Sequence, residues 1–295
     1  MTHVPVLLNE TAGFVLAGNP KIIVDATLGA GGHTRKILES NSEVKVIGID
    51  CDSEILGLAE KNLREFKERV TIVKENYRNI ESVLASLGVA GVDGAVFDLG
   101  VSSLELDSPE RGFSFLHEAP LDMRMDREGR LTAEAIVNEL NETELADIIF
   151  KYGEERFSRR IARNIAQSRE RKRIETTTEL AELVRLSVPP NCRHGRIHPA
   201  TRTFQALRIA VNDELTGLSK ALEKMPGLLT PGAKLCVISF HSLEDRIVKK
   251  NFVAAAKQEA PVYKLLTKKP LIPGEAETAV NPRSRSSKLR VAERI

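Results

Sequence analysis

Short apolar runs alternate with stretches of helical spacing over residues 21–97. Val- and Ile-rich runs of the kind found in buried strands occur at 21–24, 44–49, 70–73 and 92–97. Apolar positions recur every three or four residues at 34–40, 53–66 and 80–87. Strands that alternate with helices in this way predict an α/β fold with a doubly wound parallel sheet.

The alternation stops near residue 106 and resumes near residue 199. In between, helical spacing recurs at 131–140, 142–152, 154–169 and 177–186. The later part predicts a long helix at 204–225, a turn at 229–232, a strand at 234–240 and an extended or mobile basic tail from 260, with a last strand near 289–292. We therefore expect an α/β domain in two parts, residues 1–105 and 199–295, interrupted by an inserted all-helical domain at 106–198.

Polar side chains follow the predicted strands at the points where the strands end. Asp25, Asp50 and Asp98 come directly after apolar runs, and Tyr77 follows the third run closely. The carboxyl ends of parallel strands meet at one edge of a sheet, which is where doubly wound folds bind ligands. We expect Asp50 to accept hydrogen bonds from the two hydroxyls of a ribose, and Tyr77 to pack either against an adenine ring or in the core.

Three glycines after the first strand predict a tight, ligand-binding loop. Gly29, Gly31 and Gly32 can adopt positive φ angles, and the helix that follows presents free N–H groups to the loop. A dinucleotide fingerprint needs a third glycine at a position where this sequence has none. The pattern therefore favours a nucleoside ligand with an amino-acid tail, S-adenosylmethionine, over a nicotinamide dinucleotide. An ordinary glycine turn in an α/β protein is the structural alternative.

Composition narrows the class of protein. The chain has 295 residues, ample for a large core, and no apolar run approaches the length of a membrane span. Its three cysteines are far apart and lack partners at zinc spacing, so the sequence suggests neither disulfides nor a metal site. We expect a cytoplasmic protein that has no membrane partner and requires no metal.

Two basic runs stand out against a net charge of only +2. Residues 151–173 contain nine Lys and Arg against three Asp and Glu, and residues 281–295 contain five against one. Such runs are often simply solvated faces, but beside a nucleoside site they favour a polyanionic partner. Aromatic residues make up 4% of the chain and Trp is absent, so phosphate contacts should dominate over base stacking.

Several longer strings together resemble the bacterial RsmH family, also called MraW. They are His3 to Leu7, Gly31 to His33, Asp98 to Ser103, Arg111 to Phe115, Pro120 to Asp126, Tyr152 to Arg156, Thr201 to Ile209, Ser239 to Arg246, and Asn281 to Arg283. The resemblance runs nearly end to end. It implies a class I, Rossmann-like methyltransferase sheet, discontinuous in sequence, with an inserted helical domain. It also implies methyl transfer from S-adenosylmethionine to the N4 amine of a cytidine in the decoding region of 16S rRNA, in the small ribosomal subunit.

The resemblance also assigns residues to the cofactor. Carried over by position, the contacts fall on Gly31, Gly32, His33, Asp50, Tyr77, Asp98 and Glu105. The family commonly has glutamine where this chain has Glu105, and a carboxylate can accept a hydrogen bond there but cannot donate one as an amide does.

The proposed chemistry needs a hydrogen-bond acceptor for the cytosine N4–H and a route for its proton. Asp98 is one catalytic candidate, although it can equally bind the cofactor. His241, at the carboxyl end of a predicted strand, is the second, and a structural hydrogen-bonding role is its alternative. Ser242 and Asp245 have the spacing of a helix capping box after it.

The substrate RNA has its own candidates. Phe113 and Phe115 are positioned to stack on a flipped base or to pack in the core. Phosphate contacts are expected from Arg159, Arg160, Arg163, Arg202 and Arg208. We interpret Asp122, Arg124 and Asp126 as an ion-pair network that braces the insertion.

Other functions remain open at this point. One is a methyltransferase for a small amine or a protein side chain, which the basic insertion disfavours. Another is a non-catalytic ribosome-assembly factor that binds S-adenosylmethionine, which the acidic strand ends Asp50 and Asp98 disfavour.

Overall fold

The computed structural model describes residues 5–195 and 197–295, so His3 and Val4 lie outside the described residues. The chain forms two compact units. The α/β unit comprises Met1–Gly100 and Leu215–Ile295, and the helical unit is Val101–Glu214. The boundaries expected from the sequence were 105/106 and 198/199, so the helical unit is longer at both ends than the predicted insertion.

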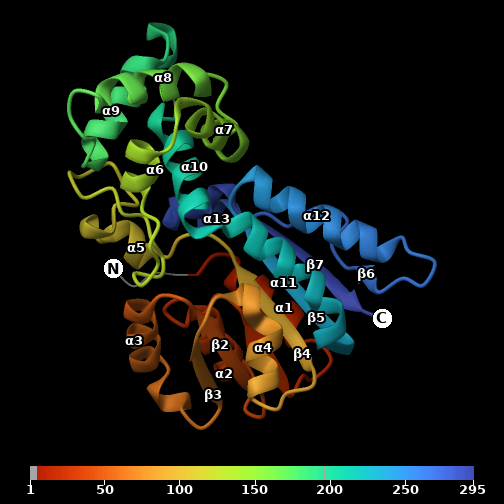
Figure 1. The fold of residues 1–295 in the computed structure, drawn as a ribbon. Helices are drawn as coiled ribbons and strands as arrows, with labels where there is room; N and C mark the ends of the chain where they lie inside the picture. The colour runs from red at the N-terminus through yellow and green to blue at the C-terminus, as the bar shows by residue number, and fades with distance from the viewer. Residues whose placement is uncertain (1–4, 196) are drawn as a thin grey trace. The chain divides into compact units, whose positions relative to one another are not determined.

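The α/β unit is built on a seven-stranded sheet with the order β3-β2-β1-β4-β5-β7-β6 (Figure 1). The strands are β1 (Ile22–Asp25), β2 (Lys45–Asp50), β3 (Val70–Lys74), β4 (Val92–Asp98), β5 (Leu229–Ser239), β6 (Tyr263–Leu265) and β7 (Lys288–Arg294). Strands β1 to β5 are parallel to one another, and β7 is antiparallel to both β5 and β6. This is the predicted class I methyltransferase sheet, and its strand order reverses between β1 and β4, where such sheets bind ligands.

Helices cover both faces of this sheet. Those that do so are α1 (Leu8–Val15), α2 (Gly32–Ser40), α3 (Ser53–Asn62), α4 (Ile80–Ser86), α11 (Glu214–Leu228) and α12 (Ser242–Ala256). The unit also contains α13 (Glu275–Val280) and the short 3₁₀ turns η1 (Arg64–Phe66), η2 (Tyr77–Asn79) and η5 (Pro282–Ser286). Val24 and Phe97 pack with α4, α11 and α12, whereas Ile23 and Val96 pack with α1, α2 and α3. Neighbouring strand residues thus enter different cores because side chains alternate across a strand.

The helical unit contains six α-helices among its described residues. They are α5 (Ser103–Asp107), α6 (Ala133–Glu139), α7 (Glu142–Gly153), α8 (Ser158–Arg169), α9 (Thr177–Ser187) and α10 (Ala200–Asn212), with 3₁₀ turns η3 (Pro109–Arg111) and η4 (Pro190–Cys192). One apolar cluster holds them together and includes Ile149, Ile161 and Leu207. Capping boxes start α7 and α9, because in each a polar side chain and a glutamate three positions later satisfy each other's backbone N–H.

Three predicted elements differ from the structure. The long helix predicted at 204–225 is two helices, because Asp213 has a left-handed φ of 50° that ends α10. Glu154 has φ 49° and ends α7, so the next helix starts at Ser158 rather than at 154. The turn predicted at 229–232 lies within β5, where the pairing with β4 shifts register.

The C-terminal segment is part of the sheet, so the prediction of an extended or mobile tail is wrong. The last strand predicted near 289–292 is present as β7, between β5 and β6. Leu289 and Val291 enter one core, and Ala292 enters the other. Arg290 is buried and pairs with Asp245 at 2.6 Å, so part of the basic charge of this segment is neutralised internally.

Candidate cofactor site and the helical unit

The glycine loop joins β1 to α2 at the carboxyl edge of the sheet. Gly31 has φ 84°, a left-handed conformation that favours glycine, and Gly32 is the first residue of α2. A Cβ on Gly32 would lie 2.2 Å from Cγ of Pro5, so the N-terminal segment lies against this loop. The loop therefore tolerates no side chain at Gly32 without a shift of Pro5.

Asp25 braces the loop from beneath. Its carboxylate accepts a hydrogen bond from the Thr34 hydroxyl at 2.7 Å and one from the Thr27 N–H at 3.3 Å. The side chain is buried, and burial raises its pKa. Both of its oxygens are engaged within the loop, so Asp25 acts as a structural support.

Asp50 ties the same loop to β2. One carboxylate oxygen accepts the Gly29 N–H at 2.9 Å and the other accepts the Asp52 N–H at 3.0 Å. Burial raises the pKa of Asp50 to about 6, although both backbone hydrogen bonds oppose that shift. Each oxygen keeps a further lone pair, so the carboxylate can also accept hydrogen bonds from a pair of ligand hydroxyls.

Asp98 and His33 form a pair at the switch point of the sheet. The Asp98 backbone N–H donates to the Thr27 hydroxyl at 2.6 Å, and its Oδ2 lies 3.4 Å from His33 Nε2. Its Oδ1 is buried without a hydrogen-bond partner among the residues that the structure describes. Buried carboxylate oxygens are normally satisfied, so this atom suits a donor supplied by a ligand.

The charge state of His33 follows from this pairing. Burial lowers the pKa of its imidazole, but the hydrogen bond and charge of Asp98, together with the charges of Asp25 and Glu277, more than offset this effect and raise it. The side chain is buried. Asp98 thus stabilises the charged form of His33 against the effect of burial.

Tyr77 begins the turn η2 just after β3. Its ring meets the Phe97 ring edge to face, with centroids 5.9 Å apart, and the side chain is half-buried. One side of the ring is therefore held by the core. This position is compatible with both roles expected for Tyr77.

His241 caps α12. Its Nδ1 accepts the Glu244 backbone N–H at 3.4 Å, and the Glu244 carboxylate accepts the N–H groups of Phe240 and His241. The capping pair is thus His241 with Glu244, and the pair predicted at Ser242 and Asp245 is wrong by one position. The Nε2 atom lies 3.1 Å from Glu244 Oε1 but makes no hydrogen bond among the described residues, so Glu244 is the neighbour of both nitrogens and the partner of Nδ1 alone.

Comparison with known proteins places this chain in a family. The model of the MraW methylase family matches residues 1–295. The chain belongs to the MraW methylase family. This match confirms the prediction of a methyltransferase that uses S-adenosylmethionine as its cofactor.

Relatives of this MraW methylase cover nearly the whole chain. A protein of Trichormus variabilis named "Ribosomal RNA small subunit methyltransferase H" is 52% identical over 293 residues, which are 99% of this chain and 92% of the relative. A protein of Citrifermentans bemidjiense with the same name is 48% identical over 307 residues, covering 99% and 98%.

Solved structures are more distant. A putative rRNA-methylase from Clostridium thermocellum matches with a TM-score of 0.46 and 13% identity, covering 100% of this chain and 98% of that one. A putative methyltransferase from Streptococcus mutans in complex with SAH matches with a TM-score of 0.47 and 11% identity, covering 100% of both chains. Within residues 5–195 and 197–295 of this MraW methylase, no helix has the length and apolar character needed to cross a membrane.

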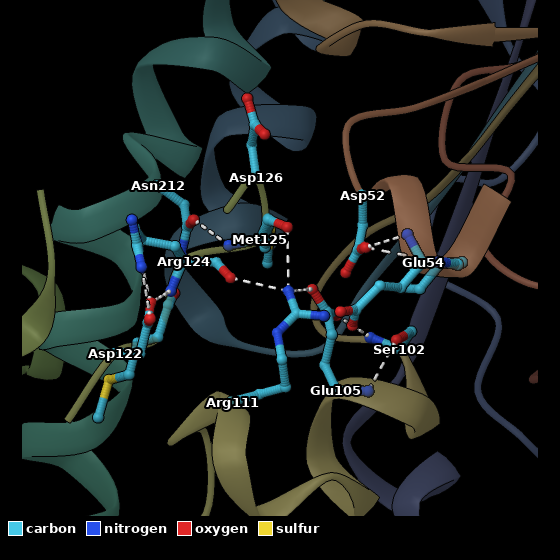
Figure 2. A network of polar contacts seen from close by, with 12 residues as sticks. Asp52, Glu54, Ser102, Glu105, Arg111, Asp122, Arg124, Met125, Asp126 and Asn212 are labelled. Atoms are coloured by element: carbon cyan, nitrogen blue, oxygen red, sulfur yellow. Dashed lines mark hydrogen bonds and ion pairs between the residues drawn. The ribbon is translucent and has the colours of Figure 1, made fainter. Parts of the chain in front are cut away.

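In the helical unit of this methylase, a polar network orders the segment before α6. The Asp122 carboxylate binds the Arg124 guanidinium through two contacts of 2.7 Å, as the expected ion-pair network requires. Arg111 donates to the carbonyls of Arg124 and Met125 at 2.9 and 3.0 Å (Figure 2).

Asn212 of α10 closes this network. Its side chain donates to the Met123 carbonyl at 2.8 Å and accepts the Met125 N–H at 2.8 Å. Figure 2 shows Asn212 facing the Met125 backbone from α10. The segment containing residues 122–126 is thus bound on both sides by the helical unit.

Glu105 takes part in the same network. It accepts the Ser102 N–H at 2.7 Å in a capping box and lies 4.0 Å from the Arg111 guanidinium. The side chain is buried. The carboxylate therefore has structural partners inside its own unit, and a cofactor contact would have to be made beside them.

The two phenylalanines predicted to approach the substrate differ in their surroundings. Phe113 is buried in the core of the helical unit. Phe115 is partly exposed, and its ring lies 4.8 Å from the rings of both His198 and Phe204. Of the two, Phe115 is the more exposed side chain.

The five predicted arginines also separate by environment. Arg159 and Arg160 on α8 are exposed and have no ion-pair partner among the described residues. Arg163 is exposed and lies 3.6 Å from the Glu142 carboxylate. Arg202 is 54% exposed and lies 3.9 Å from the Glu155 carboxylate.

Arg208 is different. Its guanidinium binds the Glu214 carboxylate through contacts of 2.9 and 2.8 Å, and both side chains are largely buried. Arg208 is therefore a weaker candidate for a phosphate contact than the four exposed arginines, because its charge is neutralised by Glu214. The sequence gives no signal of this pair, since Glu214 lies beyond the end of the helix that carries Arg208.

Proposed function

We propose that this methylase transfers a methyl group from S-adenosylmethionine to the N4 amine of a cytidine in the decoding region of 16S rRNA. The observation that carries this proposal is the near full-length identity of 52% to a protein named "Ribosomal RNA small subunit methyltransferase H". The choice of cytidine N4 and of the decoding region rests on the family resemblance found in the sequence. Such a substrate would place the enzyme in the cytoplasm, acting on the small ribosomal subunit.

The cofactor would lie along the carboxyl edge of β1, β2 and β4. The backbone at Gly31 and Gly32 would approach it, Asp50 would accept its ribose hydroxyls, and Tyr77 would flank its adenine. His33 would hold Asp98 in place. When bound, the cofactor supplies a methyl group made electrophilic by its sulfonium.

Asp98 Oδ1 is the best-placed acceptor for the second substrate. The lone pair of the cytosine N4 is delocalised into the ring, so the amine must lose planarity as it attacks. A carboxylate oxygen that accepts one N4–H would favour this change, and it has the lone pair to do so. The same atom could instead bind the amino group of the cofactor. Loss of the first role would lower kcat, whereas loss of the second would raise the dissociation constant for S-adenosylmethionine.

His241 is the weaker catalytic candidate. Its Nδ1 lone pair accepts a backbone N–H, and its Nε2 faces Glu244. A role as proton acceptor would require α12 to lose its cap. We therefore assign His241 a positioning role and leave the N4 proton to Asp98 or to water.

The RNA would be bound mainly through phosphates. Arg159, Arg160, Arg163 and Arg202 present exposed guanidinium groups, and Phe115 offers an aromatic face for an unstacked base. Glu105, which the resemblance assigns to the cofactor, would act through the Ser102 cap and Arg111 rather than by touching the cofactor directly.

The decisive experiment is methyl transfer from labelled S-adenosylmethionine to unmodified 30S subunits and, separately, to protein-free 16S RNA, followed by digestion to nucleosides. Label in N4-methylcytidine supports the proposed atom, and its absence from free RNA would indicate that an assembled surface is needed. If neither substrate accepts label while the cofactor still binds, the proposal fails. The alternative of a non-catalytic, cofactor-binding assembly factor would then be favoured.

A further inference from the structure

Lysines are concentrated on α12 and on the segment that follows it. Residues 246–269 contain seven Lys and Arg and a single acidic residue. Six of the seven are exposed lysines without an ion-pair or hydrogen-bond partner in the part of the chain that the structure describes. We call them the α12–β6 lysines: Lys249, Lys250, Lys257, Lys264, Lys268 and Lys269.

Lysines from α12 and from the segment after β6 meet on one surface of the α/β unit. Lys249 on α12 and Lys268 after β6 line the same shallow pocket, together with Thr267. Tyr263 of β6 packs on Phe252 of α12, with ring centroids 5.7 Å apart, so the helix and the strand lie side by side (Figure 1).

The positions of the other lysines follow from the geometry of α12 and β6. Lys250 and Lys257 are seven residues apart, so they lie two turns apart on the same side of α12. Lys264 is exposed in a strand whose previous residue, Tyr263, is buried, so it points to the opposite side of that strand. The charges are thus spread over both elements.

The α12–β6 lysines have no carboxylate partner among the described residues, and they follow one another closely in the chain. Several other exposed cations of the unit lie beside carboxylates, as in the pairs Lys21 with Glu43, Arg35 with Glu39 and Lys224 with Glu81. Exposed lysines elsewhere in the described chain that also lack a partner, such as Lys45, Lys61 and Lys220, are far apart in the sequence. Six uncompensated lysines repel one another, and a polyanion relieves that repulsion while it releases its own counterions.

The direction of α12 relates this surface to the catalytic edge. The helix starts at Ser242, directly after β5 ends, at the carboxyl edge of the sheet. Its 15 residues then extend for roughly 22 Å away from that edge. A strand of RNA with one nucleotide at the catalytic edge would therefore have phosphates within reach of α12.

We propose that the α12–β6 lysines, apart from Lys264, which points away from α12, form an RNA-contact surface on the α/β unit itself, in addition to the arginines of the helical unit. The proposal rests on the proposed function, because it takes the substrate RNA as the partner. The aromatic residues between these lysines, Phe252 and Tyr263, are buried. Lysines without exposed aromatic neighbours contact phosphates and do not read bases, so this surface contributes affinity and not the choice of nucleotide.

The test compares two triple variants with equal loss of charge. The first is Lys249→Gln, Lys250→Gln and Lys268→Gln. The matched control is Lys45→Gln, Lys61→Gln and Lys220→Gln, which removes three other exposed lysines of the same unit. Binding to unmodified 30S subunits and to 16S RNA is measured at several salt concentrations, and calorimetric binding of S-adenosylmethionine reports the integrity of the fold.

The surface variant should bind both RNA substrates at least tenfold more weakly than the control. The slope of log K against log salt should fall by about 2 for three lost contacts with single-stranded phosphates. Equal binding by the two variants overturns the proposal. Weaker binding to 30S subunits but unchanged binding to 16S RNA also overturns it, because the partner would then be a ribosomal protein.

These outcomes are separable from failure of the proposed function. If the surface variant binds RNA more weakly than the control but the wild-type protein transfers no methyl group, the proposed reaction is contradicted and the proposed surface stands. If the wild-type protein methylates RNA but the two variants bind RNA equally well, the proposed surface is contradicted and the proposed reaction stands.

Discussion

The backbone N–H of Leu7 donates a 2.8 Å hydrogen bond to the carboxylate of Glu277, 270 positions later in the chain. Leu7 is buried and has a left-handed φ of 51°, which is unfavourable for a residue with a side chain. Pro5, two residues earlier, lies against Gly32 of the cofactor loop. Glu277 therefore holds the N-terminal segment in a strained conformation beside the loop.

Replacing Glu277 should loosen this segment. We expect Glu277→Ala to lower the free energy of unfolding by about 1–3 kcal/mol, because a buried N–H loses its partner. Glu277→Gln keeps an acceptor oxygen and should lose less. Affinity for S-adenosylmethionine should fall in the same order, measured by calorimetry beside urea unfolding. Glu275→Gln, on the exposed side of α13, is the control, and an effect of similar size there would argue against this role.

A side chain at Gly32 should disturb the loop directly. The Cβ of Gly32→Ala would lie 2.2 Å from Pro5 Cγ, so Pro5 or the start of α2 must move. We expect a loss of stability of about 1–3 kcal/mol and a weaker complex with S-adenosylmethionine. Gly57→Ala is the comparison, since its Cβ meets nothing within 4 Å and a helical Ala should stabilise by about 0.5–1 kcal/mol. Thermal melts that shift alike for both variants would contradict this account.

The pairing of Asp98 with His33 predicts linked effects. Asp98→Asn removes the negative charge that raises the pKa of His33, so that pKa should fall, as NMR titration of the imidazole would report. If Asp98 accepts the N4–H, kcat at saturating cofactor should fall by about 10²–10⁴. If it binds the cofactor instead, the dissociation constant for S-adenosylmethionine should rise with a smaller change in kcat.

Asp50 predicts a pH dependence with a definite sign. Its pKa is raised in the folded protein, from 3.8 to about 6, so the folded state holds the proton more tightly than the unfolded state. The contribution of Asp50 to folding stability should therefore decrease as pH rises through this window. Cofactor binding should show the opposite trend, because the ionised carboxylate accepts ribose hydroxyls best. Calorimetry at pH 5.5 and 7.5 should show weaker binding at the lower pH, and Asp50→Asn should remove most of that difference.

Two arginines that look alike in the sequence should behave differently. Arg208→Ala leaves the largely buried Glu214 carboxylate without its bidentate partner, and we expect a loss of about 3 kcal/mol in unfolding free energy. Arg159→Ala removes an exposed side chain and should change stability by less than about 0.5 kcal/mol while it weakens RNA binding. Urea unfolding and RNA binding at several salt concentrations, measured on both variants, separate the two roles. Normal stability in Arg208→Ala would contradict the internal pairing.

Local sequence determined much of the α/β unit. Strand β2 and the loop at Gly31 could be predicted because apolar runs, a carboxylate and glycines follow one another within a few residues, where neighbours in sequence are neighbours in space. Asp50 and Asp98 could be placed together because parallel strands end at one edge. The sequence motifs that resemble the RsmH family added the prediction of methyl transfer from S-adenosylmethionine.

Tertiary structure decided what depends on contacts between distant residues. The hydrogen bond from Leu7 to Glu277, the pair of Arg208 with Glu214 and the insertion of β7 between β5 and β6 have no local signature. Whether a cation faces solvent or a carboxylate depends on which surface the fold buries, and the spacing of charges along a chain carries no record of that. For the same reason the sequence marks the arginines of α8 and Arg208 alike, and only folding separates a charge available to RNA from one already neutralised.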